Sequence, residues 1–418
     1  MDDGKKINAR SVIIWSVANL FYLYEVILRV SPSVMTDGLM RHYGITTSLL
    51  GLLVSCFYFS YTLLQIPCGL ILDRLGARNL IGFSVILSIV GSVLFAITDQ
   101  MWIGQLGRFL VGAGAASAFV SSLQIASVLF PVRYFPLFAG ITNMMGTFGA
   151  LFGGFPVARC VNVFGWRETV LLLAIFGVVI ALAAFLIIPK VIKISENTHL
   201  RNHFMAVLMK IFKNKQIILS GLVGGFMYLP ISAFSELWAI PFFMANYGVD
   251  NETASFAAST LFIGFALGSI PVAMVARKIN GYVKTIRFSI VGVALLFIPL
   301  IYVHNIYLSF AIVFLIGILT NGEVLVFTCA KNNESPRNAG SAIAFSNGLI
   351  MFAGLIFQPV LGVLLDLFWT GKVSEHGLRI YDVSCYQNAI LTLPICLIIA
   401  YALSLYMKET IEAEKNRH

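Results

Sequence analysis

The chain has 418 residues, of which 59% are hydrophobic and 11% are charged, with a net charge of +9; its mean hydropathy is +0.89. A soluble domain carries about 25% charged residues, so this composition excludes a soluble enzyme and a nucleic-acid-binding domain. The long apolar runs also exclude a transmembrane β-barrel, whose strands alternate apolar and polar residues. The sequence therefore predicts an all-α polytopic membrane protein.

Twelve apolar runs, each long enough to cross a bilayer as a helix, follow one another along the chain. We expect spans at 12–35, 47–71, 79–97, 102–128, 136–158, 167–188, 217–245, 254–276, 284–303, 306–329, 339–366 and 386–407. The long polar segment 190–215 divides these spans into six and six. It predicts a basic linker between two pseudo-symmetric six-helix bundles, 1–189 and 216–418.

The distribution of lysine and arginine predicts the orientation. With the N-terminus inside, the inner segments hold 21 of these residues and the outer segments hold five. Because positive charge accumulates on cytoplasmic loops, both termini and the linker are expected in the cytoplasm, and the short termini are typical of a bacterial inner-membrane protein. Two six-helix halves are typical of transporters built from repeats, whose solute site lies near the midplane.

The first span places ionisable residues inside the membrane, where they are costly and usually functional. Tyr22, Glu25 and Arg29 recur at helical spacing, which predicts one shared face. We expect Tyr22 and Arg29 to contact the substrate, because the planar guanidinium of arginine suits a carboxylate, and Glu25 to carry a proton. The alternative is a static i,i+4 ion pair between Glu25 and Arg29.

The loop after the second span reads Gly69-Leu-Ile-Leu-Asp73-Arg74-Leu-Gly76-Ala-Arg78. Gly69 permits close helix packing, Gly76 permits a tight turn, and Asp73 can face the N-terminus of another helix. This segment resembles the cytoplasmic signature loop of the major facilitator superfamily, G-x-x-x-D-R-x-G-x-R. The resemblance implies that these residues brace the closed cytoplasmic side during alternating access. The corresponding segment of the second half, Gly268 to Arg287, keeps basic residues but lacks the acid.

The fourth and fifth spans carry two further patterns of that family. Arg108-Phe-Leu-Val-Gly112-Ala-Gly114-Ala-Ala resembles its R-x-x-x-G-x-G-A-A pattern, and Arg108 is expected to bind substrate or to partner Glu25. The run from Gly146 to Gly154 resembles the glycine-rich motif of the fifth helix, but the proline after Gly149 is missing, which weakens an export function.

Polar residues in other spans complete the candidate site. Asn143 and Asn347 occupy equivalent spans of the two halves and are expected to bind substrate or to form bonds between helices.

Glu236 follows Tyr228 on one face of the seventh span, past Pro230, which should bend that helix. We expect Tyr228 to bind substrate and Glu236 to carry protons, unless Glu236 reaches the outer interface. Trp238 is expected to anchor that interface or to form an outer gate. Glu323, near the cytoplasmic end of the tenth span, is expected as a proton exit step, a gate partner or a hydrated side chain.

Three stretches resemble a proteobacterial branch of the superfamily, some of whose members take up amino acids or nucleosides in intracellular bacteria. They are Tyr24 to Met35, Leu237 to Pro241, and Asn347 to Asp366.

Together these features predict a secondary active, proton-coupled transporter, acting by alternating access. An amino acid, short peptide or organic carboxylate is the expected solute, and the protein is expected to be a monomer in the bilayer, without cofactor, metal or nucleic acid. The sequence lacks a nucleotide-binding motif G-x-x-x-x-G-K-[ST] and a HExxH motif. Two alternatives stay open, export of an amphipathic compound and a transporter-like sensor without turnover. A disulfide between Cys160 and Cys385 also stays open.

Overall fold

The structure is a computed structural model that describes residues 7–190, 210–335, 338–374 and 378–409, apart from the side chains at 66–67, 69–75, 132 and 136. Within these residues, 12 helical segments are long and apolar enough to cross a membrane, which confirms the predicted all-α multi-pass fold. The chain divides into two compact units: Met1–Tyr43 with Leu53–Glu196, and Gly44–Leu52 with Asn197–His418.

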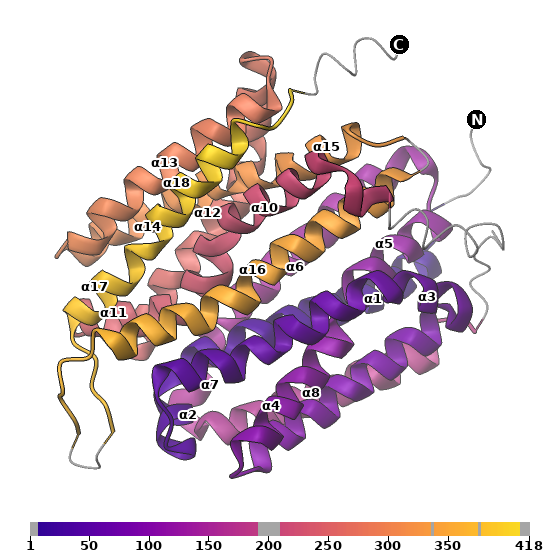
Figure 1. Cartoon of the computed structure of the whole chain (residues 1–418). Helices are drawn as coiled ribbons and strands as arrows, with labels where there is room; N and C mark the ends of the chain where they lie inside the picture. Colours follow the sequence, from indigo (N-terminus) through magenta and orange to yellow (C-terminus); the bar gives the residue numbers. More distant parts are fainter. Residues whose placement is uncertain (1–6, 191–209, 336–337, 375–377, 410–418) are drawn as a thin grey trace. The chain divides into compact units, whose positions relative to one another are not determined.

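The first unit is built around its N-terminal helix. In chain order it contains α1 (Ala9–Val30), η1 (Ser31–Val34), α2 (Thr36–Tyr43), most of α3 (Thr47–Ile97), α4 (Met101–Ala115), α5 (Ala118–Leu129), η2 (Val132–Tyr134), α6 (Phe135–Gly153), α7 (Phe155–Phe164) and α8 (Trp166–Ile187) (Figure 1). Helix α1 packs against α4, α5, α6 and α8. A Cβ on Gly149 of α6 would lie only 2.6 Å from the carbonyl oxygen of Leu23. Glycine at this position therefore allows α6 to pack closely on α1.

Helix α3 is interrupted at Gly76, where the backbone has φ 72° and ψ 158°. Glycine adopts such a positive φ at little cost because it has no Cβ. The interruption separates the spans Thr47–Gln65 and Gly76–Ile97, and it confirms the predicted tight turn. Arg78 is half-buried. The side chains of Asp73 and Arg74 and the surroundings of Gly69 lie outside the described part of the chain.

The second unit contains the remaining spans. They are α10 (Lys215–Leu229), η3 (Pro230–Trp238), α11 (Ala239–Tyr247), α12 (Asn251–Lys278), α13 (Tyr282–Tyr302), α14 (Ile306–Thr320), η4 (Asn321–Glu323), α15 (Val324–Asn332), α16 (Ala339–Leu367), α17 (Val383–Ile390) and α18 (Thr392–Ser404) (Figure 1). The helix pairs α12 with α14, α10 with α16, and α13 with α18 pack together. The seventh span runs continuously through α10, η3 and α11.

The first residues of α3 belong to the second unit because they bind α16. The Ser48 amide donates to Asp366 Oδ2 at 3.0 Å, and the Thr47 hydroxyl donates to the Gly362 carbonyl at 2.9 Å. The Tyr381 hydroxyl donates to the other oxygen of Asp366. A carboxylate at a helix N-terminus is favoured by the helix dipole, so Asp366 caps α3. This contact joins residues more than 300 positions apart and was not predicted from the sequence.

An ion pair joins the segment before α10 to the turn between α15 and α16. Lys210 Nζ lies 2.6 Å from Glu334 Oε1. Desolvation tends to raise the pKa of Glu334, but the hydrogen bonds from Lys210, Ser335 and Asn338 outweigh it and lower that pKa to about 2. Beside this pair, a small apolar core holds α10 to α15 and α16, formed by Ile211, Ile217, Ala330, Ala342 and Phe345.

All six cysteines are free in the structure.

Candidate functional site

The carboxyl group of Glu25 lies in the interior of the first unit. Glu25 as a whole is only 2% exposed. The Ser88 hydroxyl on α3 donates to Glu25 Oε1 at 2.6 Å. Among the described residues, Oε2 has no hydrogen-bond partner. Glu25 is therefore a buried acid, and the described residues satisfy only one of its two oxygens.

Arg108 on α4 holds the end of α1. Its Nη1 donates to the carbonyl oxygen of Leu28 at 2.8 Å, and its Nη2 donates to that of Arg29 at 3.4 Å. The last carbonyls of a helix lack partners within the helix and carry its negative dipole, so a buried cation suits this position. The guanidinium also lies 5.3 Å from the ring centre of Phe57 and interacts electrostatically with Glu25. Arg108 therefore binds the backbone of α1 and lies within electrostatic reach of Glu25.

The remaining predicted residues of the first unit do not join Glu25. Glu25 binds Ser88, and the i,i+4 ion pair with Arg29 is absent from the described contacts of Glu25. The ring of Tyr22 lies 5.3 Å from that of Phe119 on α5. Residues three apart in a helix differ by about 60° around its axis, which explains why Tyr22 and Glu25 contact different helices. Arg29 is half-buried, and Asn143 on α6 is exposed.

In the second unit, Glu236 lies in a π-helical segment. This segment, η3, begins at Pro230, directly after α10. Proline has no amide hydrogen to donate and its ring disturbs the preceding turn, and π-helical segments are frequent at functional sites. Glu236 is 1% exposed and Tyr228 is 8% exposed. The alternative that Glu236 reaches the outer interface is therefore wrong. The predicted shared face of Tyr228 and Glu236 assumed α-helical spacing, which does not hold beyond Pro230 because η3 is π-helical.

Hydrogen bonds to backbone carbonyls hold η3 against α16. Gln358 Nε2 donates to the Ser232 carbonyl at 2.8 Å, and Trp238 Nε1 donates to the Gln358 carbonyl at 3.0 Å. Trp238 is 1% exposed. The expectation that it anchors the membrane interface is wrong, because its indole N–H finds a partner inside the unit.

Glu323 lies in a second interruption, the 3-10 segment η4 between α14 and α15. It is 3% exposed, and the tenth span continues past it to Asn332. Glu323 therefore lies further from the end of the tenth span than expected, and its side chain is buried rather than hydrated. Asn347 on α16 is half-buried. In the described part of the chain, no cluster of three or more His, Cys, Asp or Glu side chains could hold a metal ion.

Ser88 and Gln358 also belong to the site, although they carry no charge and were not predicted from the sequence. Ser84, Ser88 and Ser92 recur every fourth residue in an otherwise apolar span, which is a signal for a polar stripe on one helix face. Ser84 and Ser117 hydroxyls hydrogen-bond at 2.8 Å, so the stripe also joins α3 to the start of α5.

Comparisons with known proteins agree with this architecture. The family model of the Major Facilitator Superfamily matches residues 14–240 and 237–417. The uncharacterized transporter YybO of Bacillus subtilis is 25% identical over 341 residues, covering 76% of this chain and 74% of that protein. The probable sulfoacetate transporter SauU of Cupriavidus necator is 30% identical over 172 residues, covering 40% and 39%.

A solved structure shows the same fold. A bacterial homologue of the human lysosomal transporter Spinster superposes with a TM-score of 0.80 at 16% sequence identity, covering 96% of this chain and 97% of that chain. The family match spans nearly the whole chain, and the relatives are transporters rather than enzymes. The chain therefore belongs to the Major Facilitator Superfamily of membrane transporters.

Proposed function

We propose that the chain is a proton-coupled secondary transporter of a small organic carboxylate, working by alternating access. The observation that carries this proposal is the buried Glu25 beside Arg108 in a chain of this family. We further propose that the termini face the cytoplasm of a bacterium, that the protein lies in its inner membrane, and that it works as a monomer.

Glu25 is the proposed proton carrier of the first unit. A buried carboxylate with few hydrogen bonds is costly as an anion, and Arg108 offsets part of that cost. Because Arg108 also holds the carbonyls of Leu28 and Arg29, a change at Arg29 on substrate binding would reach Glu25 through one shared residue. We assign Glu236 and Glu323 as the acids of the second unit that pass or sense protons.

Arg29 is the proposed carboxylate-binding residue, with Tyr22, Asn143, Tyr228 and Asn347 completing the substrate contacts. Arg108 is reassigned as a positioning residue, because its guanidinium is occupied by backbone carbonyls. The turn at Gly76, with Gly69, Asp73, Arg74 and Arg78, is proposed to stabilise the closed cytoplasmic state.

The relatives favour an organic acid over an amino acid or peptide. Besides the probable sulfoacetate transporter SauU, they include a probable L-galactonate transporter and a gentisate transporter. All three solutes carry a carboxylate and no amino group. This supports a small organic anion as the solute class for the present chain.

The test is a panel of radiolabelled sulfoacetate, L-galactonate, gentisate and alanine, offered to proteoliposomes with and without an imposed pH gradient. We expect one of the three acids to accumulate only with the gradient. Arg29→Gln should reduce its uptake by about tenfold or more, the loss of one charge-assisted contact, while Arg29→Lys retains part of it. Equal uptake by wild-type and Arg29→Gln protein, or accumulation of none of the acids, would contradict the proposal.

A further inference from the structure

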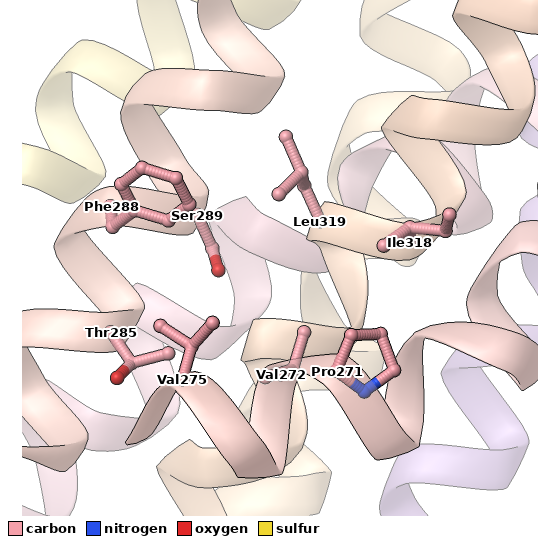
Figure 2. Close-up of a pocket in the computed structure, with 8 residues that line it drawn as sticks. All are labelled: Pro271, Val272, Val275, Thr285, Phe288, Ser289, Ile318 and Leu319. Carbon is pink, nitrogen blue, oxygen red and sulfur yellow. The ribbon is translucent and has the colours of Figure 1, made fainter. Parts of the chain in front are cut away.

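An apolar hollow lies between three helices of the second unit. It has a volume of about 60 Å³ and is lined by Pro271, Val272, Val275, Thr285, Phe288, Ser289, Ile318 and Leu319 (Figure 2). These residues come from α12, α13 and α14. Pro271 lies inside α12, where it removes a backbone hydrogen bond and disturbs the turn before it.

The hollow opens on a face of the unit that is covered with exposed apolar side chains. Ile270, Met274, Phe288 and Leu295 are 68%, 65%, 60% and 61% exposed. In a protein that spans a membrane, such a face contacts acyl chains rather than water. A void beside this face would lose dispersion contacts on its lining, so a lipid chain is the occupant that the surroundings supply.

Basic side chains flank the hollow at one end. Arg277 and Lys278 end α12, and Lys284 lies in the first turn of α13. All three are exposed, and none makes a hydrogen bond or an ion pair with the described residues. A nearby acid, Glu409, follows α18 and accepts hydrogen bonds from the amides of Tyr282 and Val283 at the start of α13. Three cations are therefore available to an anionic ligand.

Ser289 lies in the wall of the hollow. The residue is 1% exposed, and its hydroxyl has no hydrogen-bond partner among the described residues. The hydroxyl lies against Gly322 of η4, because a Cβ on that glycine would clash with Ser289 Oγ. The hollow therefore presents an apolar lining, which suits an acyl chain.

We propose that this site binds an anionic glycerophospholipid. Its headgroup phosphate is held by Arg277, Lys278 and Lys284, and part of one acyl chain enters the hollow between α12, α13 and α14. Basic clusters beside gaps between membrane helices are a known way to hold anionic headgroups. The proposal requires only that the protein spans a membrane and is independent of the transported solute.

The test measures lipid retained by the purified full-length protein. The protein is equilibrated with mixed micelles that contain phosphatidylglycerol or phosphatidylcholine, and bound lipid is counted by native mass spectrometry. Wild-type protein should retain phosphatidylglycerol preferentially. Lys278→Gln with Lys284→Gln should weaken that retention by about thirtyfold, because each cation near an anionic lipid contributes roughly a factor of five.

Two further variants separate the headgroup from the acyl chain. Lys213→Gln with Lys215→Gln removes the same charge from exposed positions before and at the start of α10 and should leave retention unchanged. Val275→Phe fills the hollow and should lower the retention of both lipids, without selecting between headgroups.

Three results would overturn the proposal. One is equal retention of the two lipids by wild-type protein, and another is an equal loss in the two double-lysine variants. The third is a wild-type dimer that Val275→Phe dissociates while Lys278→Gln with Lys284→Gln leaves it intact, because the hollow would then belong to a contact between two copies of the chain.

Discussion

The two units bury their acidic side chains in different backbone surroundings. In the first unit, Glu25 lies within the regular helix α1, and side chains from α3 and α4 complete its surroundings. In the second unit, Glu236 and Glu323 lie where the α-helix is interrupted, in η3 and η4. The comparison shows two ways to place an acid inside a membrane protein: by partners on neighbouring helices, or by a local change of the helix itself.

The largest expected effect concerns the cation of the first unit. Arg108→Gln removes two charge-assisted hydrogen bonds to α1 and should lower the free energy of unfolding by about 3 kcal/mol. Thermal unfolding of the purified protein measures this loss. The control is Arg10→Gln, which changes an exposed residue of α1 and should change the free energy of unfolding little. Wild-type stability combined with lost transport would instead assign Arg108 to substrate binding.

A smaller effect is expected where η3 meets α16 in the second unit. Trp238→Phe removes the hydrogen bond to the Gln358 carbonyl while keeping most of the ring, and should cost about 1 kcal/mol of stability. The matched change Trp102→Phe affects a 63% exposed indole and should cost less. If Trp238→Phe and Trp102→Phe lowered the stability equally, the π-helical segment η3 would not depend on the hydrogen bond from Trp238 to the Gln358 carbonyl.

The smallest effect is expected at the ion pair of Lys210 with Glu334. The folded pKa of Glu334, about 2, lies below its ordinary value of 4.5, so its contribution is fully present above pH 4.5 and is lost as the pH falls toward 2. Lys210→Gln should cost at most about 1 kcal/mol at pH 7, because the Lys210 side chain is 61% exposed.

This difference between wild-type and Lys210→Gln protein should shrink as unfolding is measured at decreasing pH. Lys213→Gln, an exposed neighbour, should show no such pH dependence. A difference that stays constant down to pH 2 would mean that the two residues contribute through packing rather than through charge.

Much of the fold was predictable because its cause is local in the sequence. Apolar runs of sufficient length define the 12 spans, and a tight turn was expected at Gly76, which adopts a positive φ. These predictions use only the cost of burying polar backbone and the freedom of glycine.

The geometry of the candidate site was less predictable because it depends on partners far apart in the chain. Glu25 binds Ser88, 63 positions away, instead of the neighbour on its own helix. Trp238 finds its partner on α16, so its indole is buried, whereas a tryptophan in a membrane span was expected at the membrane interface. The α-helical register assumed for Glu236 fails because the segment after Pro230 is π-helical.

The most direct measurement of the central claim is the movement of protons driven by solute. Proteoliposomes holding an internal pH dye receive the acid that the uptake panel identifies. Wild-type protein and Glu168→Gln, an exposed acid of the first unit, should both acidify the interior. Glu25→Gln should exchange labelled solute but leave the internal pH unchanged. Acidification by Glu25→Gln at the wild-type rate would contradict the assignment of Glu25 as the proton carrier.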